Sequence, residues 1–562
     1  MRQPLRRLKA SVRHSMRGIR YPVLVIAATA LAVEIPFLHY GFPSGHDVDF
    51  HLYSWLEVAQ QWRQGILYPR WATLAHFAYG EPRFIFYPPA SWVLGAALTA
   101  IFPWTVVACI YIWMALTAAG VSMYALAGRW LNRRDALFAA CLYAANPYHL
   151  LTVYWRSAFA ELLAASLLPL LLILLLNFSQ KTASRQWDII APLGIVLAAA
   201  WLINAPAAVM VHYSLALLAV IIAWRERSPR LLLMTGLAVI VGACLSAFYL
   251  LPAIYEQQWV HITDAISQGS RPQDNFLFIH TDDPEHDAFN RIVSWLATAE
   301  ILITLATLAI AHKWRKTRAA MWYALTGWAM VSALLMFSPT GFLWSHLPKL
   351  QFMQFSWRWL LCLSMVLSLA VTIGVRQWWA RFALCTMMLL VIVTAWTRVQ
   401  PPWWDNSADL REMQDNVATG AGYEGTDEYT PNGADPATID KNARRVTVDG
   451  PAQAAIRILA WQAESKIFFA EMSEPSNVAI KLFNYPAWQV EVNNTVVITG
   501  AREGSGQMLV PLGRGSNRVQ IAFIRTWDRK AGGWISAITA LALLAWIFIF
   551  RKQNAQTSGV EN

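Results

Sequence analysis

Charged residues are scarce in this sequence. Asp, Glu, Lys and Arg make up 14% of the 562 residues, whereas a soluble protein of this size carries about 25%. Hydrophobic residues make up 56%, and apolar runs recur from Tyr21 to Phe550. Many of these runs approach the ~20 residues that cross a bilayer core. The composition excludes an ordinary water-soluble chain and predicts a polytopic α-helical membrane protein.

Cysteine is also scarce, with five residues that all fall inside apolar runs. Their positions give neither a disulfide framework nor a metal-ligand spacing. The net charge is +11, but the basic residues stand in short clusters between apolar runs. This pattern is typical of cytoplasmic loops and argues against a nucleic-acid partner. The first apolar run has no A-x-A-like cleavage site, so we expect it to be retained as a helix.

The basic clusters also predict the topology. The N-terminal tail, residues 1–20, should stay in the cytoplasm. If residues 104–128 form the second crossing, the later basic clusters also lie in the cytoplasm, whereas an extra crossing by residues 89–102 would place them all outside. Residues 89–102 are too short to span comfortably, so we expect them at the outer face. The result is about twelve spanning helices with both termini cytoplasmic.

This topology divides the chain into a membrane domain and an outer domain. The membrane domain covers residues 21–398, and the last helix with its cytoplasmic tail covers 531–562. The outward-facing loops of the membrane domain are residues 39–103, 149–157, 252–290 and 338–357.

Residues 399–530 should form an extracytoplasmic domain. A loop-like part rich in Gly, Asp and Pro opens it, and six short runs with strand alternation follow, such as "AAIRILAW" and "KIFFAEM". Turn signals such as "SEPSN" and "GRGSN" separate the runs. Several short strands at this spacing predict a small antiparallel β-sandwich.

The outer segment after the first helix concentrates ionisable residues. "PSGHDVDFHLYSWLEV" contains Asp47, Asp49 and His51. Apolar residues at helical spacing predict an amphipathic helix over 48–64 that lies on the membrane, with Asp47 at or near its N-cap. A purely capping role for Asp47 is therefore an alternative to a chemical role.

Other outward-facing residues could join Asp47. "GEPRFIFYPP" adds Glu81, Arg83 and Tyr87. Carboxylates at membrane depth are costly and are usually functional or paired, so Glu161 is either part of a site or the ion-pair partner of Arg156.

Two further segments leave alternatives open. Arg358, between two tryptophans, could bind a phosphate through its guanidinium fork or anchor an aromatic belt. The acidic stretch 280–287 offers oxygen and imidazole groups that suit Mg or Mn. Because its spacing matches no specific metal motif, a solvated acidic loop is the simpler interpretation.

The order of these motifs resembles the GT-C superfamily of membrane glycosyltransferases. Asp47, His51 and Gly65, followed by "YPP" at 87–89, follow the superfamily pattern. "GHDVDFH", "LQFMQFSWRWL" and "YPAWQVEV" are similar to bacterial GT-C-like proteins of the YfhO type. Members of this group are also described as 6-pyruvoyl-tetrahydropterin synthase-related membrane proteins, although no residue singled out here supports pterin chemistry.

The resemblance implies the roles of the site residues. Asp47 would be the catalytic base that takes the acceptor's hydroxyl proton. Arg156, Arg358 or Arg83 would stabilise the departing phosphate. The remaining substrate-binding candidates are Asp49, His51, Glu81, Tyr87 and Glu161. A divalent cation, Mn or Mg, could bind at Asp47 and Glu81, but the family's usual Asp-Glu pair is interrupted here by Val48.

The resemblance also implies the function. The chain would be an inverting glycosyltransferase in the inner membrane of a bacterium, with its active site on the extracytoplasmic side. It would move a sugar from a polyprenyl-phosphate carrier to an envelope acceptor, namely a glycolipid, a polymer or a protein. Two other hypotheses stay open: a transporter or lipid flippase, and a non-catalytic scaffold that binds glycan through its C-terminal domain.

Overall fold

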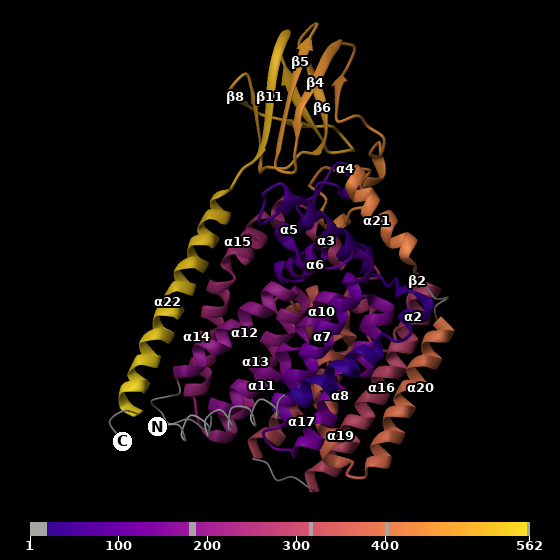
Figure 1. The fold of residues 1–562 in the computed structure, drawn as a ribbon, viewed down its shortest axis with the longest axis vertical. Helices are drawn as coiled ribbons and strands as arrows, with labels where there is room; N and C mark the ends of the chain where they lie inside the picture. The colour runs from indigo at the N-terminus through magenta and orange to yellow at the C-terminus, as the bar shows by residue number, and fades with distance from the viewer. Residues whose placement is uncertain (1–19, 179–186, 314–318, 400–403, 559–562) are drawn as a thin grey trace, which may run out of the picture. The chain divides into compact units, whose positions relative to one another are not determined.

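The structure is a computed structural model that describes residues 20–178, 187–313, 319–399 and 404–558. Except for Arg20, the basic tail predicted at residues 1–20 lies outside the described residues. The chain forms two compact units, each built from three stretches of sequence (Figure 1). The first unit comprises Met1–Asp49, Thr105–Gly242 and Ile266–Ala408, and the second comprises Phe50–Trp104, Ala243–Ala265 and Asp409–Asn562.

The first unit is almost entirely helical. Its longer helices are α7 (Trp104–Ala127), α8 (Arg133–Ala144), α11 (Leu167–Phe178), α12 (Ile190–Ile203), α13 (Ala205–Glu226), α14 (Arg230–Leu245), α16 (Pro284–Lys313), α17 (Ala319–Leu334), α19 (Leu360–Gly374) and α20 (Trp378–Val399). Its shorter elements are α2 (Phe37–Tyr40), β1 (Phe42–Pro43), α9 (Pro147–Leu151), η1 (Thr152–Arg156), α10 (Phe159–Ala164), η5 (Pro272–Asp274), η6 (Ser338–Thr340), α18 (Gly341–His346), η7 (Leu350–Met353), η8 (Ser356–Trp359) and β2 (Trp404–Asp405). The stretch Ile262–Ile266 forms the short helix η4.

The long helices are apolar enough to cross a membrane. In the described ranges, seven helices pass this test by length and composition, or nine if each of two bent helix pairs is one span. α7 and α12 carry no charged side chain, and a helix that is apolar on all sides belongs in a protein core or in lipid. Large side chains such as Leu233 and Ile240 of α14 are exposed, as expected for lipid-facing positions. The prediction of a polytopic α-helical membrane protein is confirmed, whereas the count of about twelve spans stays a prediction.

The predicted outer loop at 149–157 is largely helical. α9 continues into the π-helix η1, which ends at Arg156, and a single candidate span runs over Arg133–Arg156. Residues 149–156 were predicted as a turn, whereas they are helical, because Asn146 caps α9 by accepting a hydrogen bond from the His149 amide.

The outer segment at 39–103 contains several helices. α3 (Val48–Arg63) confirms the helix predicted over 48–64, and Asp47 directly precedes it. Two short helices, α4 (Ala75–Ala78) and α5 (Arg83–Phe86), follow. α6 (Pro89–Ile101) has 13 residues, which is too short for an ordinary span, as predicted for residues 89–102.

The second unit carries the β-structure. One antiparallel sheet has the strand order β3-β6-β10-β9, and the other has β4-β5-β11-β7-β8. The strands are β3 (Val446–Asp449), β4 (Ala454–Trp461), β5 (Ser465–Met472), β6 (Ser476–Phe483), β7 (Trp488–Val492), β8 (Thr495–Val497), β9 (Gly500–Ala501), β10 (Gln507–Leu512) and β11 (Gly515–Phe523). β4, β5 and β11 lie side by side in Figure 1. The predicted C-terminal β-rich region is confirmed.

Burial alternates along strands such as β5 and β11, and the inward residues of both sheets form one shared core. Inward residues of both sheets, such as Phe468 and Val510, belong to one hydrophobic cluster. Trp71 and Tyr79, from the stretch before α5, belong to it as well. The Trp71 and Trp488 ring centroids lie 5.5 Å apart, and the Phe483 amide donates to the Tyr79 carbonyl oxygen at 3.1 Å. The stretch around α4 and α5 is therefore part of the same folded body as the strands.

Helices complete the second unit. α15 (Ala247–Glu256), which continues into η3 (Gln257–Trp259), packs against α22 (Trp527–Ser558). The short helices η9 (Asp427–Tyr429) and η10 (Pro436–Thr438) follow α21 (Ser407–Thr419). The loop-like part predicted at the start of this domain, residues 416–436, is mostly irregular, and only its first four residues, 416–419, belong to the end of α21. α22 begins at Trp527, four residues before the predicted start of this segment at residue 531.

Candidate active site

Asp47 lies beside Arg156 in the first unit because backbone hydrogen bonds join the two stretches. The Asp47 amide donates to the Arg156 carbonyl oxygen at 2.9 Å, and the Gly45 amide donates to Ser157 Oγ at 3.0 Å. Arg156 Nη2 then lies 3.5 Å from Asp47 Oδ2. The Asp47 side chain is 40% exposed, whereas that of Arg156 is 2% exposed. A reachable carboxylate is thus held against a buried cation.

The short β-pair before this stretch fixes its start. Phe42 pairs with Asp405 and Pro43 with Trp404 in antiparallel register. Ser157 Oγ donates back to the Pro43 carbonyl oxygen at 3.1 Å. The stretch that leads to Asp47 is therefore held at both its beginning and its end.

An irregular helix end positions Arg156. η1 is a π-helix, a form that is frequent at functional sites, and it stops at Ser157, whose φ is +50°. α10 begins two residues later and carries Glu161 in its first turn. Arg156 Nη1 lies 2.6 Å from Glu161 Oε2, so the ion pair considered from the sequence is present.

Arg358 joins the same carboxylate. It lies in η8, directly before α19, and its Nε is 3.2 Å from Glu161 Oε2. Its Nη1 donates to the Met353 carbonyl oxygen at 2.6 Å and to Gln354 Oε1 at 3.2 Å. Arg358 is only 6% exposed. It is therefore a member of the buried cluster and lacks the exposure of an interfacial anchor.

Tyr148 completes the cluster and was missed by the sequence interpretation. Its hydroxyl donates to Glu161 Oε1. It lies in α9, about two turns before Arg156, where the span ends. A lone tyrosine within an apolar run carries no signal of its own, so Tyr148 could not be selected from sequence.

Aromatic rings surround the two guanidinium groups. Phe355 and Trp357 stack with centroids 4.9 Å apart, and the Arg156 guanidinium carbon lies 5.2 Å from the Trp357 centroid. The same carbon of Arg358 lies 4.8 Å from the Phe355 centroid. Cation–π contacts of this kind stabilise a guanidinium group more strongly when water is excluded from it. Two buried guanidinium groups thus share Glu161 and the rings, and Asp47 is the exposed carboxylate at their edge.

The predicted residues Glu81 and Arg83 belong to the second unit, where they pair with each other. Arg83 Nε lies 2.5 Å from Glu81 Oε1, and His76 Nε2 lies 2.9 Å from Glu81 Oε2. The Thr426 amide donates to Glu81 Oε2 at 2.9 Å. Burial alone would raise the pKa of Glu81, but Arg83 and His76 outweigh it and hold that pKa at about 2.

The remaining predicted residues divide between the two units. His51 and Tyr87 belong to the second unit, where their rings lie 5.8 Å apart beside Phe50. Asp49 belongs to the first unit and is exposed in the first turn of α3. Asp47, Arg156, Glu161 and Arg358 are therefore the predicted residues that the structure brings into one cluster.

A second buried carboxylate in the second unit was not predicted. Glu57 accepts hydrogen bonds from the Tyr423 hydroxyl and Thr73 Oγ1, each at 2.5 Å. Burial raises the pKa of Glu57, although these hydrogen bonds oppose the rise. Tyr53 stacks on Tyr423 with centroids 4.2 Å apart. These contacts join α3 to the stretch after α21.

The residues predicted to bind a metal do not form a metal site within either unit. In the ranges that the structure describes, no three His, Cys, Asp or Glu side chains come together as metal ligands. Both carboxylate oxygens of Glu81 are bound by protein donors, so Glu81 does not fit as a ligand. Asp47 belongs to the other unit, and a cation at Asp47 stays a prediction.

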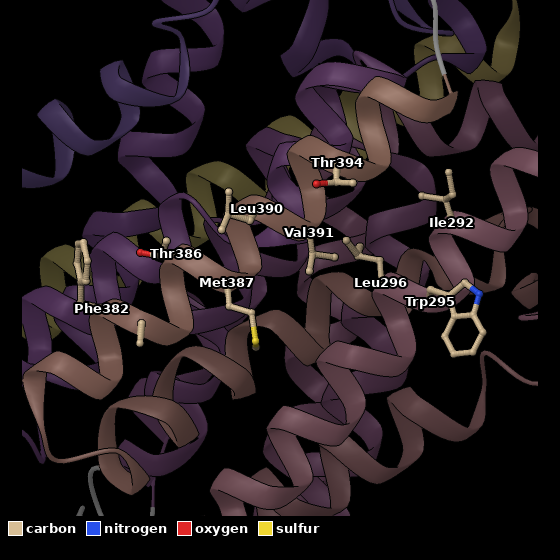
Figure 2. Close-up of a pocket in the computed structure, with 10 residues that line it drawn as sticks. Ile292, Trp295, Leu296, Phe382, Thr386, Met387, Leu390, Val391 and Thr394 are labelled. Carbon is tan, nitrogen blue, oxygen red and sulfur yellow. The ribbon is translucent and has the colours of Figure 1, made fainter.

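Two apolar grooves lie in the first unit. One, of 610 Å³, is lined by residues that include Pro36, Cys141, Tyr154, Trp155 and Met388. The other, of 740 Å³, lies between α16 and α20, where Leu296 lies opposite Val391 (Figure 2). No ionisable side chain is among the described residues that line the second groove. Both grooves are apolar enough to hold an apolar chain.

The fold and the buried charges define a polytopic membrane protein with a C-terminal β-rich region. The chain belongs to the family described as the 6-pyruvoyl-tetrahydropterin synthase related domain, a membrane protein family, whose match covers residues 84–401 and so more than half of the chain. No curated protein sequence matches the chain significantly.

Among the solved structures that match this chain are two with low sequence identity and low TM-scores. The Archaeoglobus fulgidus oligosaccharyltransferase in its apo form is 14% identical with a TM-score of 0.38, and the match covers 73% of this chain and 56% of that one. The chain thus spans about half the length of that protein. ArnT from Cupriavidus metallidurans, solved with undecaprenyl phosphate, is 14% identical with a TM-score of 0.35, and the match covers 73% of this chain and 90% of ArnT.

Proposed function

We propose that the protein is an inverting, GT-C-type glycosyltransferase that moves a sugar from a polyprenyl-phosphate carrier to an envelope acceptor. The observation that carries this proposal is the exposed carboxylate of Asp47 beside the buried Arg156. Transfer from a lipid phosphate requires a base and a cation next to each other, and the cluster contains both.

Asp47 is the proposed base. Its side chain is 40% exposed, so an acceptor hydroxyl can reach it. In a single displacement, the acceptor oxygen forms a bond to the anomeric carbon while the bond from that carbon to the phosphate oxygen breaks. The hydroxyl proton goes to Asp47, and the electron pair goes to the departing phosphate. One base is enough for this step, which inverts the anomeric centre.

Arg156 and Arg358 are the proposed phosphate-binding groups. Both are buried, and both contact a single shared carboxylate, Glu161. A fixed cation with low exposure stabilises the growing charge of a leaving phosphate without reorganising water. The guanidinium fork can also bind two phosphate oxygens at once. Glu161 and Tyr148 would hold the two guanidinium groups in place.

The apolar groove of 610 Å³ supports a lipid carrier. Trp155 lines it and is the chain neighbour of Arg156. An isoprenoid chain seated there would bring its phosphate end toward the cluster. The undecaprenyl phosphate in the ArnT structure is a molecule of this class. The description of the family mentions pterin chemistry, but the residues of the cluster suit a phosphate and a hydroxyl.

The finer topology belongs to the same proposal. About twelve spans would place both termini in the cytoplasm of a bacterium and the Asp47 cluster outside its inner membrane. The exposed Arg133 and Arg134 at the start of α8 would lie on the cytoplasmic side. The two sheets of the second unit would form an extracytoplasmic sandwich.

The test is sugar transfer by purified protein in lipid nanodiscs. A radiolabelled polyprenyl-phosphate sugar is supplied with an envelope extract as acceptor, in the presence of Mn, Mg or a chelator. We expect labelled product from wild type and from Asp282→Asn, an exposed carboxylate outside the cluster. The Asp47→Asn variant should form labelled product about 10²–10⁴-fold more slowly.

Other outcomes would favour the alternative hypotheses. Lipid or sugar flux into proteoliposomes without covalent transfer would indicate a transporter or flippase. Glycan binding that is lost with residues 399–530 and unaffected by Asp47→Asn would indicate a scaffold. If wild type transfers sugar in Mn or Mg but not in the chelator, the reaction requires a divalent cation.

A further inference from the structure

A polar cavity lies entirely within the second unit and has no role in the proposed transfer. Its volume is 420 Å³, within the range of about 300–1,000 Å³ that is common for small-molecule sites. The end of α3, the stretch before α4, the end of α21 and strands β4 to β6 contribute to its wall. Four of the residues that line it are cationic: Arg444, Arg445, Lys466 and Lys481. None of the described lining residues is Asp or Glu.

Lys466 is the buried cation of this cavity. It lies in β5 and is 3% exposed. Its Nζ donates to the Gln462 and Ala463 carbonyl oxygens, each at 3.3 Å, and lies 4.3 Å from the Trp488 ring centroid. These partners are all neutral. Burial lowers the pKa of Lys466 to about 7, although nearby Glu464 opposes the shift.

The other cations extend this positive wall. Lys481 is partly buried, and its Nζ donates to the Lys441 carbonyl oxygen at 2.8 Å. Burial lowers the pKa of Lys481, and Asp440 opposes that shift. Arg445 is exposed, and its guanidinium lies 5.7 Å from the Trp461 ring centroid. An anion in the cavity would therefore meet both a buried ammonium and reachable guanidinium groups.

The neutral lining suits a sugar. Gln60, Gln64 and Gln462 bring amide groups to the wall, and Trp461 and Trp71 bring indole faces. Amides both donate and accept, as sugar hydroxyls require, and an indole face packs against the apolar side of a pyranose ring. Gln64 is already partly held, because its Oε1 accepts from the Ala463 amide at 3.1 Å.

We propose that this cavity binds an anionic saccharide, a sugar that carries a carboxylate or a phosphate group. The four cations would bind the charged group, and the glutamines and tryptophans would bind the ring. This goes beyond the proposed transfer, since no carboxylate lines the cavity to act as a base. The cavity is therefore a binding site and would capture a charged part of a glycan without reacting with it.

The experiment is calorimetric titration of the full-length protein in detergent micelles at pH 7. The probes are glucuronate, glucose 1-phosphate, glucose and inorganic phosphate. We expect one or both of the charged sugars to bind at least tenfold more tightly than glucose, and the tighter one identifies the charged group. Inorganic phosphate should bind at least fivefold more weakly than glucose 1-phosphate if the phosphate sugar is the ligand.

Matched variants locate the binding. Lys466→Met should weaken the charged sugar at least tenfold, and Arg445→Gln, which changes an exposed side chain and leaves the fold intact, at least fivefold. Arg518→Gln, an exposed cation on β11 outside the cavity, and Asp47→Asn should bind like wild type. Equal binding of glucose and the charged sugars, no binding of either charged sugar, or wild-type affinity in both cavity variants would overturn the proposal. Because Asp47→Asn keeps this site, failure here is distinct from failure of the proposed transfer.

Discussion

Gly45 shows how a missing side chain positions the base. A Cβ at this position would lie 2.6 Å from Ser157 Oγ and 2.7 Å from the Arg156 carbonyl carbon. No side chain fits there unless one of the two stretches moves. The close approach allows the backbone hydrogen bonds that set Asp47 against Arg156.

Gly45→Ala should therefore separate Asp47 from Arg156. We expect a fall in transfer rate on the order of 10²-fold, because small misplacements of reacting groups are costly. The overpacking should also lower the free energy of unfolding by about 1–3 kcal/mol. The control is Gly236→Ala in α14, where a Cβ would meet nothing within 4 Å. Transfer at the wild-type rate in Gly45→Ala would show that the close approach does not position the base.

Glu161 is the residue whose loss should matter most for stability. Glu161→Gln would leave two buried guanidinium groups without their shared carboxylate. Breaking a buried ion pair in this way costs about 3–5 kcal/mol. The measurement is thermal unfolding in detergent, with the exposed Glu503→Gln as the control. An unchanged midpoint in Glu161→Gln would contradict the cluster's role in holding the arginines.

Sequence reasoning reached the charged members of this cluster and missed its neutral ones. Charges at the ends of apolar runs are costly, which is why Arg156, Glu161 and Arg358 could be selected before the structure was known. That Arg156 and Arg358 both contact Glu161 depends on a tertiary contact between α10 and η8, which the sequence pattern does not show. Tyr148 and Phe355 carry no charge signal, and their roles follow from that contact alone.

At the scale of elements, the alternation of polar and apolar residues predicted most of the strands. It did not predict the helices outside the sheets. β5 covers the predicted "KIFFAEM", because more and less buried residues alternate along it. β10 was missed, since "QMLVPL" contains a proline that argues against a central strand. α21 was not predicted, and its last four residues fall within the loop-like part predicted at 416–436. The π-helix η1 has no sequence signature.

The inward position of Lys466 on β5 predicts a pH dependence. Its pKa in the folded protein is about 7, below the 10.5 of a free lysine. Between pH 7 and 10.5 this lysine is mostly neutral in the folded protein but protonated in the unfolded chain. The unfolded chain therefore binds more protons, and the free energy of unfolding should rise with pH over this range. Below pH 7 both states are protonated, and the full cost of burying the ammonium remains. Denaturant titrations of wild type and Lys466→Met at pH 7 and 9 measure this rise. An equal change with pH in both proteins would contradict it.

At the scale of the whole molecule, the sequence predicted domains that are continuous segments of the chain. The two units of the structure instead combine stretches that are far apart in sequence. Residues 50–104 and 243–265 group with the C-terminal β-region in the second unit. The predicted membrane domain, 21–398, contains both stretches. Trp71 and Tyr79 explain the difference, since their partners are strand residues such as Trp488 and Phe483. Contacts this far apart in sequence leave no local pattern.

The proposed topology predicts which side of the membrane each exposed residue faces. With the five native cysteines replaced, Asp282→Cys should react in intact cells with a maleimide that cannot cross the membrane. Arg134→Cys, equally exposed in the first unit, should react only after the cells are permeabilised. Labelling of both in intact cells, or the reverse order, would contradict an outward Asp47 cluster with cytoplasmic basic loops.

The measurement that tests the central claim most directly compares donor binding and turnover in Asp47→Asn. Both are measured with one polyprenyl-phosphate sugar on the same preparation. If Asp47 is the base, the variant should bind the donor with wild-type affinity and transfer its sugar about 10²–10⁴-fold more slowly. Wild-type turnover by Asp47→Asn would contradict the assignment of the base and, with it, the proposed active site.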